Sequence, residues 1–144
     1  MAANTRDEDI RRLLSKARTI AVVGLSDKPD RDSYQVARYL LSQGYDILPV
    51  NPNVTEVFGR KAFQSLSDIP LKQSIDIVDI FRRSDRVPPV VDEAIARRAG
   101  AIWMQLGVRH DSAAHSAEAR GIPVYQDRCI MQEHRRLAIG PVPG

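Results

Sequence analysis

Cysteine is almost absent from this sequence of 144 residues, since Cys129 is the only one. A single cysteine excludes an intramolecular disulfide and is typical of a reducing, intracellular compartment. Long apolar runs are also missing, and none approaches the roughly 20 residues that a membrane helix needs. The chain starts with MAANTRDEDI, which is charged and has no apolar segment like that of a secretory signal. We therefore expect a cytoplasmic protein without a membrane contact.

Several familiar site motifs are missing as well. No G-x-x-x-x-G-K-[ST] loop and no G-x-S-x-G elbow occurs, and no cluster of histidine, cysteine or carboxylate has the spacing of a metal site. The three histidines, His110, His115 and His134, are expected to have structural or surface roles. Cys129 is expected to be buried and inert, with a reactive thiol as the alternative. The sequence therefore predicts neither a catalytic residue nor a metal site.

The composition is that of an ordinary globular domain, with 43% hydrophobic and 27% charged residues. We expect a single domain spanning residues 1–144, with a sizeable core of its own. The net charge of +3 is only mildly basic. It suits a small polyanionic ligand but does not indicate binding to nucleic acid.

Apolar runs of strand length alternate with helical patterns along the chain. This alternation is typical of βαβ units, right-handed crossovers and a parallel sheet. The sequence predicts an α/β fold, a doubly wound three-layer sandwich with a five-stranded parallel sheet. The strands are expected at 20–24, 45–50, 75–81, 101–106 and 123–126, and the helices at 6–17 (within an N-terminal helical segment 1–18), 33–43, 88–98, 112–120 and 129–137. We expect 54–70 to be irregular, with a short helix near 63–66, and 138–144 to be a loose tail.

The segment after the first predicted strand is the main candidate for a ligand site. In a doubly wound sheet, ligands bind outside the carboxyl ends of the strands, and the amino terminus of the next helix favours a phosphate group. Here a polar loop containing Lys28 and Arg31 connects Gly24 to the predicted helix start at Ser33. We therefore expect this loop to bind the diphosphate of a nucleotide.

The details of this turn argue against NAD. Only Gly24 is present where a G-x-G-x-x-G fingerprint would place three glycines, and the second strand ends in Val50-Asn51-Pro52 without the usual carboxylate for the ribose. A ribose carrying a phosphate would be repelled by a carboxylate at that position, so its absence suits coenzyme A (CoA). NADP also carries a ribose phosphate and remains open at this point.

Five stretches together resemble a known family, the small stand-alone CoA-binding domain proteins of bacteria and archaea. They read AVVGLSDKPDRDSYQVARYL, GYDILPVNP, VDIFR, AIWMQLGVRH and DRCIMQEHRRL. The fold of that family is similar to the N-terminal CoA-binding domain of the succinyl-CoA synthetase α subunit. The resemblance implies a flavodoxin-like or Rossmann-like fold with CoA or an acyl-CoA lying across the strand ends.

The resemblance also implies roles for individual residues. The first turn would approach the diphosphate, with charge from two basic side chains and the helix start facing the same group. The end of the second strand would lie against the adenosine, the third strand would line the cleft, and the fourth would face the pantetheine arm. The first turn consists of Gly24, Leu25 and Ser26, its basic side chains are Lys28 and Arg31, and the helix start is Ser33 and Tyr34. The second strand ends in Asn51 and Pro52, the third strand provides Phe81 and Arg82, and the fourth provides Gln105 and Gly107.

The leading functional hypothesis is a module that binds CoA or acyl-CoA without chemistry of its own. The α subunit's catalytic histidine lies in a second domain for which these residues offer no counterpart. One alternative is a subunit of an acyl-CoA synthetase or transferase that works with a partner chain. Another is an NAD(P)-binding redox sensor. The sequence does not identify the acyl group, the partner or the oligomeric state. The role of the basic residues in the last predicted helix also stays open: they could be solvated, cover the ligand or bind a second chain.

Overall fold

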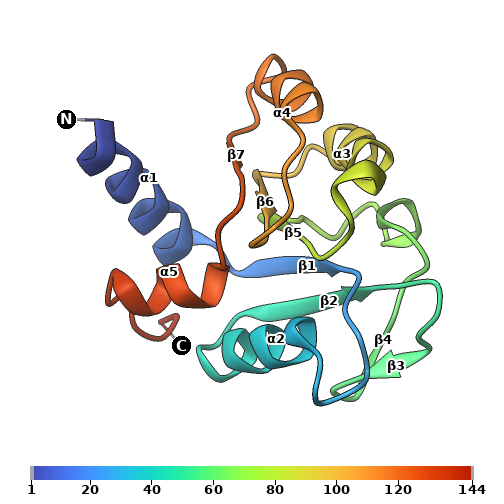
Figure 1. The fold of residues 1–144 in the computed structure, drawn as a ribbon. Coiled ribbons are helices and arrows are strands. Elements are labelled where there is room, and N and C mark those ends of the chain that lie inside the picture. Colours follow the sequence, from blue (N-terminus) through green and yellow to red (C-terminus); the bar gives the residue numbers. More distant parts are fainter. Residues whose placement is uncertain (1, 144) are drawn as a thin grey trace.

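The computed structural model describes residues 2–143 of the chain. Its centre is a parallel sheet of five strands in the order β2-β1-β5-β6-β7 (Figure 1). The strands are β1 (Thr19–Val23), β2 (Asp46–Val50), β5 (Ile77–Ile80), β6 (Ala101–Met104) and β7 (Val124–Tyr125). The predicted five-stranded parallel sheet is confirmed.

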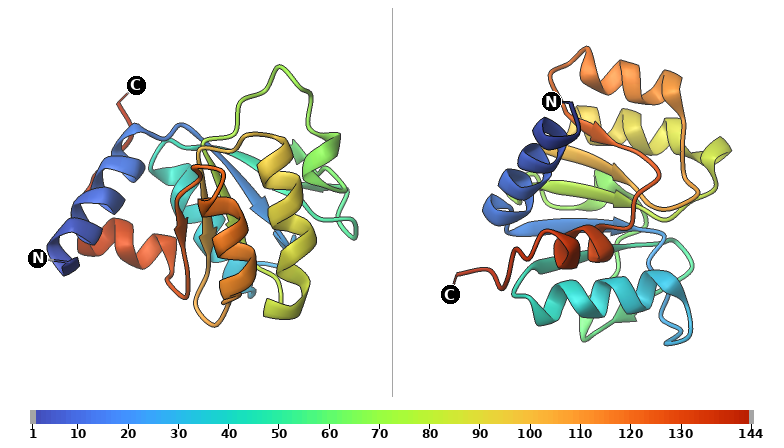
Figure 2. Two further views of the ribbon diagram at one scale, coloured as in Figure 1. Left: turned by 90° about the horizontal axis from the view of Figure 1, so that it is seen from above. Right: turned by 60° about the vertical axis from the view of Figure 1, so that its left-hand side comes forward.

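Helices cover both faces of this sheet. Two of them, α3 (Val87–Ala96) and α4 (Asp111–Glu118), pack together on one face. The other three, α1 (Ala2–Lys16), α2 (Asp32–Ser42) and α5 (Ile130–Arg136), share the opposite face, where α5 contacts both α1 and α2 (Figure 2). The three-layer, Rossmann-like architecture expected from the sequence is therefore confirmed.

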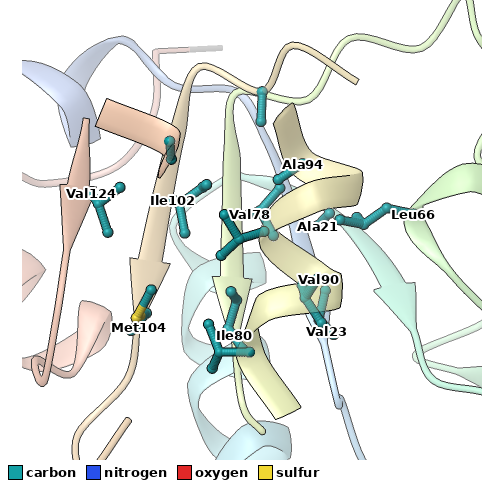
Figure 3. Close-up of a cluster of buried hydrophobic side chains, with 14 of the residues drawn as sticks. Ala21, Val23, Leu66, Val78, Ile80, Val90, Ala94, Ile102, Met104 and Val124 are labelled. Carbon is teal, nitrogen blue, oxygen red and sulfur yellow. The ribbon is translucent and has the colours of Figure 1, made fainter. Parts of the chain in front are cut away.

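Side chains that alternate along each strand point to opposite faces of the sheet, so each helical layer has a core of its own. Ala21 and Val23 face the α3–α4 layer, whereas Ile20 and Val22 face the layer formed by α1, α2 and α5. Figure 3 shows the first of these clusters, in which Val78 and Ile80 of β5 lie against α3 and Ile102 and Met104 of β6 continue the cluster toward β7. Because both faces are buried, the strands are apolar throughout, and each fully buried aliphatic side chain contributes about 1.5–3 kcal/mol.

The strand order places a switch point between β1 and β5. The chain moves outward from β1 to β2 and then returns to the other side of β1 to form β5. This is the flavodoxin-like order, in which the connections after the two central strands leave in opposite directions. The crevice for a ligand is therefore expected outside the carboxyl ends of β1 and β5.

A small hairpin replaces part of the irregular segment expected at 54–70. Its strands are β3 (Glu56–Val57) and β4 (Arg60–Lys61), followed by a short 3-10 helix, η1 (Leu66–Asp68). The turn uses Phe58 and Gly59, both with positive φ. This conformation favours Asn-Gly or Gly-Gly, so a phenylalanine at the first turn position gave no hairpin signal in the sequence.

The carboxyl-terminal tail is another correction to the sequence prediction. Beyond α5, the amide of Val142 donates to the carbonyl of Gln43 at 2.7 Å, and Ile139 and Val142 pack against the core. The part of 138–144 that the structure describes is thus docked on α2 rather than loose, and Gly144 lies outside the described residues.

A further short 3-10 helix, η2 (Ser84–Arg86), precedes α3. Between residues 2 and 143 no helix has the length and apolar character needed to span a membrane.

Candidate ligand-binding site

The loop between β1 and α2 is held by two serine side chains. Ser33 accepts a hydrogen bond from the amide of Ser26 at 3.0 Å, and the Ser26 hydroxyl accepts one from the amide of Lys28, also at 3.0 Å. Ser33 is buried and is the second residue of α2, and its hydroxyl is engaged within the loop. The two serines fix the loop so that it leads directly into the first turn of α2.

The amino terminus of α2 leaves three backbone amides free. The first helical bond runs from Gln35 to the carbonyl of Arg31 at 3.1 Å, and Arg31 provides no side-chain cap. The amides of Asp32, Ser33 and Tyr34 therefore have no acceptor among residues 2–143. Free amides together with the positive end of the helix dipole form a favourable environment for an anion.

The side chains of the same loop add no net positive charge. Residues 27–32 contain three aspartates against one lysine and one arginine, which gives a net charge of −1. Lys28 and Arg31 are both exposed and form no ion pair within the described part of the chain. Anion binding here would therefore depend first on the backbone amides and only second on these two side chains.

A cavity of about 450 Å³ opens beside this helix terminus, between α2, α5 and the ends of β5 and β6. Its volume lies within the range of small-molecule sites, about 300–1,000 Å³. Three of the predicted site residues, Phe81, Arg82 and Gln105, lie in its wall. The lining residues are Asp32, Gln35, Val36, Phe81, Arg82, Arg83, Gln105, Leu106, Val108, Cys129, Met131 and Gln132.

A second hollow, of about 630 Å³, continues from the first on the α3 side of β5. The two share Phe81, Arg82 and Arg83, and the second adds Arg86. Asp85 neutralises Arg83 through an ion pair of 3.0 Å, which leaves Arg82 and Arg86 as unpaired cations among the described residues. The site therefore joins a cavity with a buried apolar part to an arginine-lined hollow across the end of β5.

Other predicted site residues have roles within the protein itself. The Leu25 side chain is fully buried in the core, and its carbonyl accepts a hydrogen bond from Asn51 Nδ2 at 3.0 Å. Asn51 Oδ1 accepts from the amide of Asn53, also at 3.0 Å. Asn51 thus connects the end of β2 to the loop after β1.

Tyr34, Pro52 and Gly107 are three further predicted residues that do not line the cavity. The ring of Tyr34 packs on Phe58 of the hairpin, with 4.5 Å between ring centroids. Pro52 is exposed beyond β2. Gly107 is also exposed, and its amide donates to Asp127 Oδ1 at 2.7 Å. None of these contacts tests a ligand role, which stays a prediction.

Three residues of the wall come from α5 and the residue that precedes it, and they were not predicted as site residues: Cys129, Met131 and Gln132. The tertiary position of α5 brings them there, and a charged network fixes that position. Glu133 pairs with Arg128 at 2.7 Å and with Arg136 at 2.8 Å. Arg136 reaches Asp7 of α1 at 2.8 Å. Arg128, which precedes α5, and Arg136 within it therefore hold the helix in place.

Two histidines have structural roles. His134 is buried, with Nδ1 at 2.7 Å from the hydroxyl of Tyr39 and Nε2 at 3.1 Å from the carbonyl of Gly140. Burial lowers the pKa of His134. His110 caps α4 by accepting from the amide of Ala113 at 3.1 Å, and His115 is exposed. His134 and His110 thus form hydrogen bonds within the protein, and His115 lies at the surface.

Asp79 is the unusual group beneath the site. It lies in the middle of β5 between Val22 and Trp103 and is fully buried. Neither carboxylate oxygen has a hydrogen-bond partner within the described part of the chain. Burial raises the pKa of Asp79 well above its ordinary value, which favours the neutral acid. Asp79 was not predicted as a site residue, although a carboxylate between apolar residues of the run at 75–81 is a signal that could have identified it.

Another cavity, of about 490 Å³, lies beside α1 at the amino ends of the strands. Its wall includes Arg12, Lys16 and Asp76. Asp76 is already engaged, because its Oδ2 accepts from the amides of Arg18 and Thr19 at 2.8 and 3.0 Å. This cavity has neither a free helix terminus nor a position at the switch point.

The sheet order, the free terminus of α2 and the cavity at the switch point define a Rossmann-like α/β protein with its ligand crevice at the carboxyl ends of the strands. Residues 18–135 match the CoA binding domain family. The chain belongs to this family, and the resemblance stated from the sequence is confirmed.

Three relatives show the range of this likeness. The uncharacterised protein YneT of Bacillus subtilis is 40% identical over 131 residues, covering 91% of this chain and 96% of YneT. A hypothetical protein from Pyrococcus horikoshii OT3 has a TM-score of 0.88 and 42% identity, with 92% of each chain covered. The dinucleotide-forming acetyl-coenzyme A synthetase 1 of Candidatus Korarchaeum cryptofilum, solved with phosphate and ADP, has a TM-score of 0.69 and 28% identity. That match covers 81% of this chain but 26% of the synthetase chain.

Proposed function

We propose that this protein binds CoA or an acyl-CoA across the carboxyl ends of β1, β5 and β6, as a non-catalytic carrier, sensor or accessory module. The observation that carries the proposal is the cavity at the switch point, which adjoins a helix terminus with three free amides. Membership of the CoA binding domain family supports the same ligand. CoA needs both features, because it joins phosphates to a long, uncharged arm.

The phosphates have two complementary sources of binding energy. The amides of Asp32, Ser33 and Tyr34 suit a diphosphate, with Lys28 and Arg31 adding long-range attraction. Arg82 and Arg86, in the adjoining hollow, suit a further phosphate. Each charge-assisted hydrogen bond contributes about 1.5–3 kcal/mol, so two or three of them account for most of a micromolar affinity, about 8 kcal/mol.

A second candidate function is that of an accessory chain in acyl-CoA synthesis. Its support is the likeness to one quarter of the Korarchaeum synthetase, in which this fold accompanies other parts of a longer chain. This candidate predicts that a second protein co-purifies with the chain and that CoA-dependent ligase activity appears only in the pair. Purification of the chain alone in its CoA-bound form would favour the carrier or sensor role.

The decisive experiment is a calorimetric titration of the purified protein with CoA, NAD and NADP, together with mass spectrometry of any ligand released on denaturation. We expect micromolar binding of CoA, weaker binding of NAD and NADP, and CoA in the released material. No thermal stabilisation by millimolar CoA would contradict the proposal. Tighter binding of NAD or NADP would favour a redox sensor and require new roles for Asn51, Phe81 and Gln105.

A further inference from the structure

The wall of the α2–α5 cavity is divided by polarity. Its buried part is apolar, with Val36, Val108 and Cys129 each less than 10% exposed. Its charged groups, Asp32, Arg82 and Arg83, are exposed or half-buried and therefore lie toward solvent. A group that reaches the buried part must be uncharged, because burying an unpaired charge there costs several kcal/mol.

Gln105 is the exception to the apolar interior, since it is 4% exposed and lies in the same wall. Its Oε1 accepts a hydrogen bond from the amide of Ile130, the first residue of α5, at 3.0 Å. This bond fixes the orientation of the side-chain amide. Its Nε2 has no acceptor among residues 2–143, so a hydrogen-bond donor remains available among the otherwise apolar buried residues of the wall.

A donor in the cavity wall that has no acceptor in the described part of the chain suits an acceptor oxygen on the ligand. A thiol is a weak acceptor, whereas the carbonyl oxygen of a thioester is a good one. Leu106, which is 57% exposed at this cavity, adds apolar surface for a hydrocarbon group. The residues that line the cavity therefore suit an acyl thioester better than the free thiol of CoA.

Building on the proposed function, we infer that the cavity between α2 and α5 holds the thioester end of an acyl-CoA with a short, uncharged acyl group, and that Gln105 Nε2 donates a hydrogen bond to the thioester carbonyl. The volume of about 450 Å³ must also accommodate part of the pantetheine arm, which restricts the acyl group to a few carbons. The protein would then distinguish loaded from unloaded CoA.

The test compares acetyl-CoA with S-ethyl-CoA, which has the same number of heavy atoms along the chain but lacks the carbonyl oxygen. Calorimetry on the wild-type protein is expected to show acetyl-CoA binding about 5–10-fold more tightly, the value of one net hydrogen bond. Gln105→Glu keeps an oxygen for the amide of Ile130 but replaces the donor, so the ratio between the two ligands is expected to fall to about one. Gln64→Glu, the same change at an exposed position away from the cavity, serves as the control.

The outcomes separate the two proposals. Equal wild-type affinities for acetyl-CoA and S-ethyl-CoA would overturn the inference while leaving CoA binding intact. Succinyl-CoA binding as tightly as acetyl-CoA would overturn the claim of an uncharged acyl group. Failure of CoA and all its thioesters to bind would contradict the proposed function itself. If Gln105→Glu did not fold, the wild-type comparison of the two ligands would still decide the matter.

Discussion

Gly24 and Phe81 meet so closely that a Cβ atom on residue 24 would lie 2.1 Å from the carbonyl oxygen of Phe81. These residues directly follow β1 and β5, on the two sides of the switch point. Gly24 also has a φ of +88°, which L-residues with a side chain rarely adopt. Position 24 therefore requires glycine for both steric and conformational reasons, whatever its contact with a ligand.

Gly24→Ala is expected to lower the free energy of unfolding by about 2–4 kcal/mol, because the strand ends must separate to accommodate the methyl group. Gly59→Ala is the matched control: φ there is +70°, and no atom lies within 4 Å of the added Cβ. The control is expected to lose only about 1 kcal/mol. Urea denaturation measures both, and equal losses would show that the contact with Phe81 is not the cause.

Asp79→Asn is expected to stabilise the protein at neutral pH. Burial raises the pKa of Asp79 above its ordinary value of 3.8, so between the unfolded and folded pKa values the folded state holds a proton that the unfolded state has released. The free energy of unfolding therefore falls as pH rises above the unfolded pKa, and the isosteric amide escapes this loss. We expect a gain on the order of 1–3 kcal/mol at pH 7 that disappears near pH 4.

The measurement for Asp79 is urea denaturation at several pH values between 4 and 8, with Asp85→Asn as an exposed control. A gain that did not change with pH would mean that the raised pKa of Asp79 is not its cause. A loss of stability at every pH would mean that its carboxyl group makes a hydrogen bond that the amide cannot replace.

Glu133→Gln is expected to destabilise the protein by about 1–2 kcal/mol, because it weakens the paired contacts that hold α5. Hydrogen bonds from Arg136 and Arg128 lower the pKa of Glu133. Its contribution is thus present above the unfolded pKa and is lost as pH falls through the folded pKa, the opposite direction from Asp79. Thermal denaturation at pH 7 and pH 3 measures this effect, and a deficit that persisted at pH 3 would contradict it.

The control for Glu133 is Asp9→Asn, which removes an exposed contact of 3.9 Å with Arg12. Exposed pairs of this kind contribute about 0–1 kcal/mol. A loss in the control as large as that in Glu133→Gln would show that general surface charge, rather than the position of α5, sets the stability.

The double substitution Lys28→Ala with Arg31→Ala is expected to reduce CoA affinity about tenfold, because both exposed cations lie on the loop that precedes the free amides of α2. Binding of pantetheine, which has no phosphate, is expected to stay unchanged. Titrations at low and high salt measure the effect, and the loss should shrink as salt screens it. An equal loss of affinity for CoA and for pantetheine would show that this loop does not bind the phosphates.

Much of the fold could be predicted because it follows from local pattern. The apolar runs around Val22 and Val78 are buried on both faces of a parallel sheet, so their strands were evident from composition alone. The loop after Gly24 and the helix that follows it were placed correctly for the same reason. The hairpin turn at Phe58 could not be predicted, because packing rather than turn propensity supports its positive φ.

The site was predictable only where it follows directly from a strand end. Phe81, Arg82 and Gln105 lie in one cavity because parallel strands finish at the same edge. Met131 and Gln132 come from a helix whose position depends on contacts with α1, more than 100 residues earlier in the chain. The core position of the Leu25 side chain was also missed, because alternation beyond the end of a strand cannot be extrapolated through a turn.

The sequence by itself determined the class of fold and the order of its elements, because hydrophobic periodicity and the chirality of βαβ units are local properties. It also predicted the edge of the sheet at which a ligand is expected. Only the tertiary structure decided which groups face the cavity and which are engaged elsewhere. Asn51 and Ser33 are hydrogen-bonded within the protein, whereas Gln105 retains a free donor. That difference depends on the mutual position of β6, α2 and α5, which are far apart in the chain and meet only through packing.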